Sequence, residues 1–228
     1  MKILNHDSKL MQSFRLLFDY IGVNIVFVIC CIPIFTIGAA QSALYTAIRA
    51  MQRNEPWLRL FFSAFKESFK PTTLVWIVCL PIIYLFSCMV YMLATVEIPG
   101  STPALICACI LMGFLMIISA TASLLHSRFD FTAGQLFRNS IVMLLAAPIQ
   151  VILGSAAMWA PCVIFFTVPW LFLDIFFWLF LVYFSIAAVF FARLMRYPIG
   201  RLADEVPERP DSFFVREAKR RAGKLKQE

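Results

Sequence analysis

Charge is what this sequence has least of. Only 14% of its 228 residues are charged, whereas a soluble domain carries about 25% because its surface must face water. Five long stretches contain no Lys, Arg, Asp or Glu: residues 20–48, 71–96, 98–127, 139–173 and 175–192. Each is about as long as the roughly 20 apolar residues that cross a bilayer. These stretches exclude a soluble domain and predict an all-α fold, a polytopic transmembrane helical bundle.

Catalytic and metal-binding signatures are also missing. There is no HExxH, no GxSxG, no glycine-rich phosphate loop and no pair of intramembrane acids. The two histidines, His6 and His126, are far apart in the sequence, which argues against a metal site. The seven cysteines fall inside apolar stretches without metal-site spacing, so we expect them to fill the core: Cys30, Cys31, Cys79, Cys88, Cys107, Cys109 and Cys162. We therefore predict no enzyme, no cofactor and no metal.

The basic residues are unevenly distributed along the chain. They lie before the first stretch, in two of the connections and in the C-terminal region, and Lys and Arg stay on the cytoplasmic side of a membrane. The segments predicted to be cytoplasmic are 49–70, 126–138 and the C-terminus, and the turns predicted to lie outside are near 97–103 and 159–170. This rule also accounts for the basic tail without a nucleic-acid partner.

The first stretch, residues 20–48, is long for one crossing and short for two. Pro33 removes a helix hydrogen bond, and Gly38 follows closely. A broken hairpin with helices at about 14–32 and 38–53 would return the chain to the cytoplasm, giving six crossings and a cytoplasmic N-terminus. The alternative is a single crossing with the N-terminus outside.

The chain is predicted to consist of a membrane domain, residues 1–200, and a cytoplasmic basic tail, residues 201–228. The tail either rests on anionic lipid or is solvated, and the sequence leaves both open. Asp174 is the only charge between Arg138 and Arg193. An acid within a span is a functional hypothesis by default, but Pro169-Trp170 nearby is typical of a membrane boundary.

Residues 55–70 have the pattern of a short interfacial amphipathic helix. Large apolar side chains recur at helical spacing on one face, namely Leu58, Phe61, Phe62, Phe65 and Phe69. Polar and charged residues occupy the other face: Arg59, Ser63, Lys66, Glu67 and Lys70. Such a helix either anchors the bundle on membrane lipid or offers a docking surface to a partner protein.

A third segment, residues 124–130, ends the 98–127 stretch. Arg128 and Asp130 are expected to pair with each other or with the 49–70 connection. Upstream, Ser119, Ser123 and Ser127 repeat every four residues, which predicts a close helix–helix contact.

Three segments resemble the YesL family, bacterial membrane proteins classed as domain of unknown function 624. They are Pro33–Tyr45, Phe61–Lys70 and the turn Leu124–Asp130, in which His126-Ser127 stands where the family would have Ala before the Arg. Members are typically encoded beside carbohydrate-uptake genes, often with sugar ABC transporters. The resemblance therefore implies an accessory role in sugar uptake or its regulation in a bacterial cell membrane.

The leading hypothesis is a non-enzymatic membrane component that binds another membrane protein, such as an ABC sugar permease, or itself. A small stand-alone transporter or channel is the alternative, because interrupted helices often build substrate sites. The residues predicted to form the functional cluster are Thr36, Gly38, Gln41, Tyr45, Phe62, Phe65, Lys66, Phe69 and Arg128.

Overall fold

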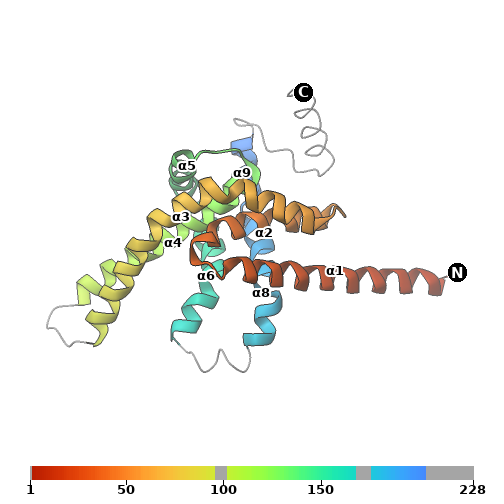
Figure 1. Ribbon diagram of the computed structural model, residues 1–228, viewed down its shortest axis with the longest axis horizontal. Helices are drawn as coiled ribbons and strands as arrows, with labels where there is room; N and C mark the ends of the chain where they lie inside the picture. The colour runs from red at the N-terminus through yellow and green to blue at the C-terminus, as the bar shows by residue number, and fades with distance from the viewer. Residues whose placement is uncertain (1, 96–101, 168–175, 204–228) are drawn as a thin grey trace.

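The computed structural model describes residues 2–95, 102–167 and 176–203, and every element in those ranges is helical (Figure 1). The elements are α1 (Lys2–Cys31), the short 3-10 helix η1 (Ile34–Thr36), α2 (Ile37–Gln52), α3 (Trp57–Thr95), α4 (Thr102–Arg128), α5 (Ala133–Ala146), α6 (Pro148–Thr167), α8 (Phe176–Leu194) and α9 (Arg196–Ala203). The predicted all-helical fold is confirmed for this part of the chain.

Helix α2 is the centre of the bundle. It packs against α1, α3, α4 and α8, and almost all of its side chains are buried. Its sequence contains five Ala residues together with Gly38 and Ser42, and these small residues let several helices approach one backbone closely. A helix of 16 residues is only about 24 Å long, so α2 is shorter than the roughly 20 residues of a full span.

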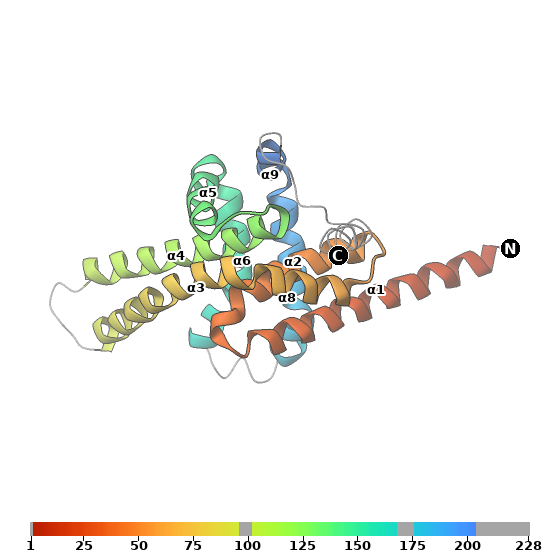
Figure 2. The same cartoon turned by 45° about the horizontal axis from the view of Figure 1, so that its top comes forward.

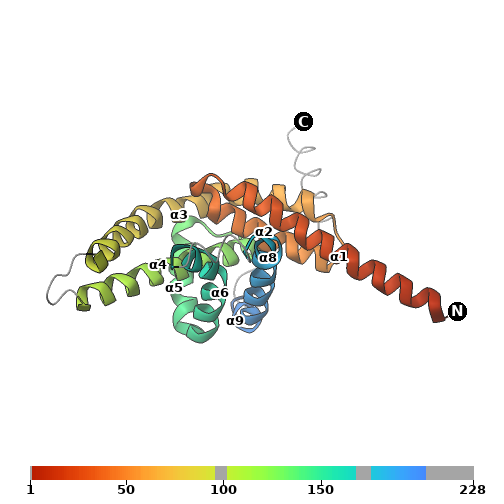
Figure 3. The same cartoon turned by 90° about the horizontal axis from the view of Figure 1, so that it is seen from below.

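The predicted break in the first stretch is confirmed, since α1 ends at Cys31 and α2 begins at Ile37. Between them, the Thr36 hydroxyl lies 2.5 Å from the Cys30 carbonyl oxygen and 2.6 Å from that of Pro33. The hydroxyl donates its single proton to this pair of carbonyl oxygens, which the interrupted helix leaves without an intrahelical donor. The chain reverses here, and α1 and α2 run side by side in opposite directions (Figures 1 and 3).

The prediction of a separate short interfacial helix is wrong. Residues 57–70 are the first part of α3, which continues unbroken to Thr95 through Pro71 and Pro81. A proline removes one hydrogen bond, and neighbouring helices and local adjustments make this tolerable in a membrane helix. The boundary expected at residue 70 came from the change in charge, which α3 crosses without a break in the helix.

The stretch 139–173 does not form one straight span either. Helices α5 and α6 meet at an angle of 117°. Ala147, between them, has φ −143° and ψ 61°, because the residue before a proline is driven out of the helical region. Pro148 then begins α6, where its missing N–H removes no bond. A second bend, of 55°, separates α8 from α9.

Two helices in the described ranges, α3 and α4, are long and apolar enough to cross a membrane. The count rises to four if each of the bent pairs α5–α6 and α8–α9 is one span. The number of crossings, five or six, stays a prediction. Asp174, most of the 97–103 turn and the tail from residue 204 lie outside the described residues.

The cysteines are only partly a core feature. Cys79 is buried, but Cys88, Cys107 and Cys109 are exposed on α3 and α4. The prediction that these three fill the core is therefore wrong.

The serine repeat of α4 lies in the core, since Ser119, Ser123 and Ser127 are all buried, and α4 packs against α2, α3, α5 and α6. Each serine hydroxyl donates to a carbonyl three or four residues back, at 2.6 to 3.0 Å.

Candidate partner-binding site

The predicted cluster divides into an interior part and a surface part. Thr36, Gln41 and Tyr45 are 4%, 3% and 1% exposed, and Gly38 is buried with them. They lie within the helix bundle, where a partner protein has no access. Phe62, Lys66 and Phe69 are exposed on α3, and Phe65 is half-buried. The structure therefore does not bring the nine residues together at one surface.

Gly38 is a close contact between α2 and α3. A Cβ atom at this position would lie 3.0 Å from the Thr72 carbonyl oxygen and 3.4 Å from the Trp76 Cβ. One helical turn later, the hydroxyls of Ser42 and Ser68 are 2.9 Å apart. Small side chains therefore let the backbones of α2 and α3 approach each other, and the two serine hydroxyls form a hydrogen bond between the helices.

Tyr45, farther along α2, lies at the contact of this helix with α8. Its ring lies edge-on to Phe191 of α8, with centroids 6.2 Å apart. Phe191 in turn lies over Gly154 of α6, so closely that a Cβ on Gly154 would fall 1.9 Å from the ring. The buried Tyr45 hydroxyl has no hydrogen-bond partner among the described residues. The ring of Tyr45 therefore supports packing at a three-helix junction.

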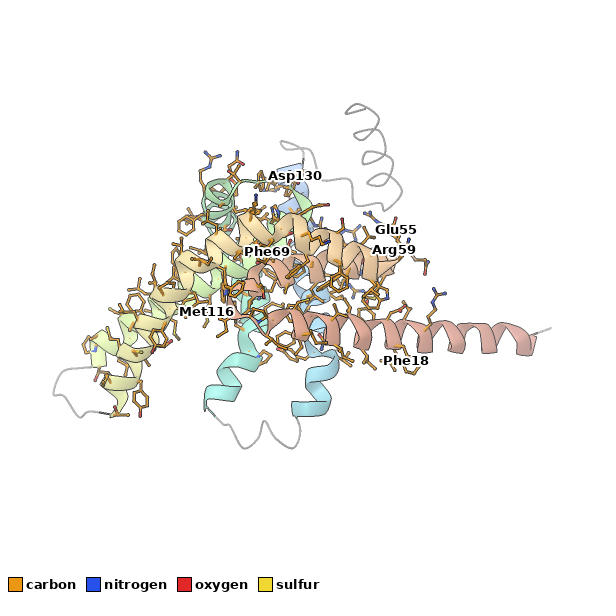
Figure 4. The ribbon with its side chains drawn as sticks, in the orientation of Figure 1. Phe18, Glu55, Arg59, Phe69, Met116 and Asp130 are labelled. Atoms are coloured by element: carbon orange, nitrogen blue, oxygen red, sulfur yellow. The ribbon has the colours of Figure 1, made fainter. Side chains whose placement is uncertain are left out.

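The surface part of the cluster lies on the first half of α3. Phe62 and Phe69 are 45% and 38% exposed, and Leu58 is 46% exposed. The exposed cations beside them are Arg59, Lys66 and Lys70. These six residues, Leu58, Arg59, Phe62, Lys66, Phe69 and Lys70, are called the α3 strip below. Figure 4 labels Arg59 and Phe69 along this helix.

The α3 strip differs from the amphipathic face predicted from the sequence. That face included Phe61, which is fully buried and stacks on Phe65 with a centroid distance of 6.4 Å. The true inner face of α3 is Leu60, Phe61, Ala64 and Ser68. At 100° per residue, the apolar and basic residues of the α3 strip therefore share one exposed side of the helix, next to each other.

Arg128 lies half-buried at the last residue of α4. Sequence analysis missed its neighbour Arg49, whose guanidinium group donates a hydrogen bond from Nη2 to the backbone carbonyl of Ser127. The last four carbonyls of a helix have no intrahelical donor, and the helix dipole favours a cation there. Arg49 of α2 thus caps α4 from a distant part of the chain.

Replacing Arg49 by Met is expected to lower the free energy of unfolding by about 1.5–3 kcal/mol, the range for hydrogen bonds to charged groups. Arg49→Lys keeps the charge and should recover part of this loss. Thermal unfolding of the detergent-purified protein measures the effect. Arg59→Met, at an exposed position on α3, is the control and should stay within about 0.5 kcal/mol of the native protein. Equal stability of the two methionine variants would contradict the capping role.

Two tryptophan contacts hold the bundle near the α1–α2 break, and neither was predicted. Trp76 of α3 stacks on Trp159 of α6, with centroids 5.4 Å apart. Their indole N–H groups donate to the carbonyls of Ile34 (2.6 Å) and Met116 (3.0 Å). A buried indole N–H needs a hydrogen-bond acceptor. The presence of Trp76 and Trp159 within uncharged stretches was therefore a signal in the sequence for such contacts between helices.

A third indole, Trp57, joins the start of α3 to α1. Its Nε1 donates to the Asp19 carboxylate at 2.9 Å, and its ring lies 3.2 Å from where a Cβ on Gly22 would be. The α3 strip therefore begins on a segment that is fixed to the bundle.

In the part of the chain that the structure describes, no three His, Cys, Asp or Glu residues gather in a way that could hold a metal ion.

Comparison with known proteins gives one family. Residues 20–92 match the model of the family described as "Protein of unknown function, DUF624". This confirms the resemblance predicted from the segments 33–45 and 61–70, while the segment 124–130 lies outside the match. The matched region runs from the middle of α1 through α2 to near the end of α3. Searches among curated proteins and among solved structures found no match.

Proposed function

We propose that this integral membrane protein is not an enzyme and acts by binding another membrane protein through the α3 strip. The observation that supports this most is the exposure of Phe62 and Phe69, 45% and 38%, beside Lys66 and Lys70. Phe61 of the same helix is fully buried, so the core of the bundle at this point is filled without Phe62 and Phe69.

The arrangement of the α3 strip favours a protein over lipid alone. An interfacial helix places its apolar face in the acyl boundary and its basic face on the opposite side, toward water. Here the face opposite the α3 strip packs on α2, so aromatic and basic residues must meet the same partner. Aromatic residues and Arg are enriched at protein interfaces, and a rim of opposite charge fixes register. The partner surface would thus be an apolar groove edged by carboxylates.

We further propose an ABC sugar permease as the partner and an accessory role in carbohydrate uptake. Both rest only on the family resemblance. The α3 strip and residues 126–138 would then face the cytoplasm of a bacterial cell, as the distribution of Lys and Arg predicts. We favour this role over a stand-alone transporter because Gly38 lies against the backbone of α3 and Gln41 is buried in α2.

A pull-down from native membranes in mild detergent tests the proposal. The C-terminally tagged native chain should recover a permease in near-equal amounts by mass spectrometry. The variant Phe62→Ala/Lys66→Ala should recover less than one-tenth as much permease, because it removes two side chains of the α3 strip. Both side chains are exposed, so their removal should leave the fold intact. These two are preferred to Phe65, which is half-buried and stacks on Phe61.

The matched control is Leu74→Ala/Ile77→Ala, which removes two exposed apolar side chains, 55% and 49% exposed, farther along the same helix. This control should bind the partner as the native chain does. Recovery of no permease by the native chain would contradict the proposed partner. Equal recovery by the strip variant and the control would contradict the α3 strip as its binding surface.

A further inference from the structure

Helix α9 bends away from α8 at one end of the bundle. The bend is 55°, and α9 lies at the same end as α5, while α6 and α8 run away from both (Figures 1 and 2). One side of α9 is buried through Pro198 and Ile199, and Ile199 belongs to the hydrophobic core. The other side of this short helix is exposed.

The exposed side of α9 and the end of α8 carry positive charge. Arg193, Arg196 and Arg201 are exposed, and the described residues 182–203 contain no Asp or Glu. The side chains of Arg193 and Arg196 form no hydrogen bond or ion pair with another described residue. Three cations thus lie within residues 193–201 without a carboxylate in the same segment, and such a surface attracts anions.

The apolar surface of α8 indicates which anion. Ile186, Phe190 and Arg193 are spaced at i, i+4 and i+7, so they lie on one side of this proline-free helix. Ile186 and Phe190 are 61% and 47% exposed, and Arg193 follows Phe190 by only about 4.5 Å along the helix. One exposed side therefore changes from hydrocarbon to cation within a turn, as a bilayer changes from acyl chains to headgroups. A soluble acidic protein would cover the arginines and leave the adjoining apolar residues in water.

Tyr197 and Arg201 orient each other on α9. The Arg201 Nη2 donates to the Tyr197 hydroxyl at 2.6 Å, and the guanidinium group lies over the ring, 4.8 Å from its centroid. The phenol accepts this bond, so it keeps its own proton to donate, and the guanidinium keeps its other N–H groups. Both groups can therefore donate to one phosphate, for which charge-assisted bonds from arginine are well suited. Tyrosine is also enriched where membrane meets water.

Gly200 leaves room beside these donors. At 100° per residue, it lies between Arg196 and Arg201 around the exposed side of α9. Nothing lies within 4 Å of the place that a Cβ atom would take. A headgroup can therefore approach the helix between the two arginines, where a larger residue would stand in its way.

We propose that the exposed end of α8 and α9 binds the headgroup of an anionic phospholipid. The residues of this site, called the α9 patch, are Arg193, Arg196, Tyr197, Gly200 and Arg201. Arg201 and Tyr197 donate to the phosphodiester, the other two arginines attract its charge, and the acyl chains lie along Ile186 and Phe190. The distribution of Lys and Arg predicts the cytoplasmic leaflet. The α9 patch and the α3 strip are on different helices, so failure of one proposal does not decide the other.

Native mass spectrometry of the detergent-purified full chain measures the dissociation constant of the first bound lipid. The native chain should bind phosphatidylglycerol at least 30-fold more tightly than phosphatidylcholine. Arg196→Gln/Arg201→Gln should weaken binding of phosphatidylglycerol about 30-fold, since each arginine near an anionic surface contributes about a factor of five. Arg15→Gln/Arg138→Gln removes two other exposed arginines and should stay within about two-fold of the native chain.

A second variant fills the room beside the donors and keeps every charge. Gly200→Leu should weaken binding of phosphatidylglycerol at least five-fold, whereas Gly113→Leu, at the matched open glycine on α4, should not. Millimolar inorganic phosphate should not displace the lipid, because phosphate makes no contact with Ile186 and Phe190. Native affinity in the Arg196→Gln/Arg201→Gln variant, native affinity in Gly200→Leu, or displacement by inorganic phosphate would each overturn the proposal.

Discussion

Gly154→Ala should lower the free energy of unfolding by about 3 kcal/mol or more, at the upper end of overpacking effects. The new Cβ would lie 1.9 Å from Cδ2 and 2.5 Å from Cε2 of Phe191, well inside contact distance. Phe191 is 0% exposed and has Tyr45 against it. The ring therefore cannot move aside, and α6 and α8 must separate. Unfolding of the purified protein in a detergent titration measures the loss.

A double-mutant cycle tests the cause. Phe191→Ala removes the ring atoms that the new methyl group would meet. The double variant Gly154→Ala/Phe191→Ala should therefore be more stable than the sum of the single effects predicts. Gly113→Ala is the matched control, because nothing lies within 4 Å of a Cβ there. It should be neutral or slightly stabilising. Additive effects in the cycle would mean that the clash with Phe191 is not the reason.

The helical class and the break in the first stretch could be predicted because both depend on local chemistry. Too few charges exclude a water-facing surface, and Pro33 limits the helix around it whatever the tertiary structure. The bend between α5 and α6 belongs to the same category. Pro148 disfavours a helical Ala147, and that signal was present in the sequence but was not used.

The inner face of α3 could not be predicted from periodicity. In a soluble protein, an apolar stripe identifies the buried side of a helix. In a membrane, lipid and core are equally apolar, so Phe61 and Phe62 look the same in sequence although one is fully buried and the other is 45% exposed. The small residues Ala64 and Ser68 were the better guide, because they sit where α2 approaches.

The cap from Arg49 to Ser127 also lay beyond sequence reasoning. The two residues are 78 positions apart, and their contact depends on how α2 and α4 pack. In the sequence, Arg49 is only one of several basic residues in the connection predicted to be cytoplasmic. Packing also explains why residues 36–45 were predicted to belong to a functional cluster. A polar segment at a helix break is compatible with a binding site and with a packed core, and only the arrangement of the helices distinguishes the two.

Gly38→Leu decides between those two interpretations of the break. A Cβ at this position lies 3.0 Å from a backbone oxygen of α3, which cannot rotate away as a side chain can. The remaining atoms of a leucine then have no room, and α2 must leave α3, its main packing partner. We expect a loss of about 3 kcal/mol or more in the free energy of unfolding, and about 1–3 kcal/mol for Gly38→Ala.

The control is Gly113→Leu, on a helix face with open space around the glycine, which should remain near native stability. Detergent unfolding and the partner pull-down are run on the same preparations. If Gly38 is a packing residue, Gly38→Ala loses stability while the folded fraction still binds the partner through the α3 strip. A Gly38→Ala protein of native stability that no longer binds would show instead that α2 belongs to the binding site, as its sequence alone suggested.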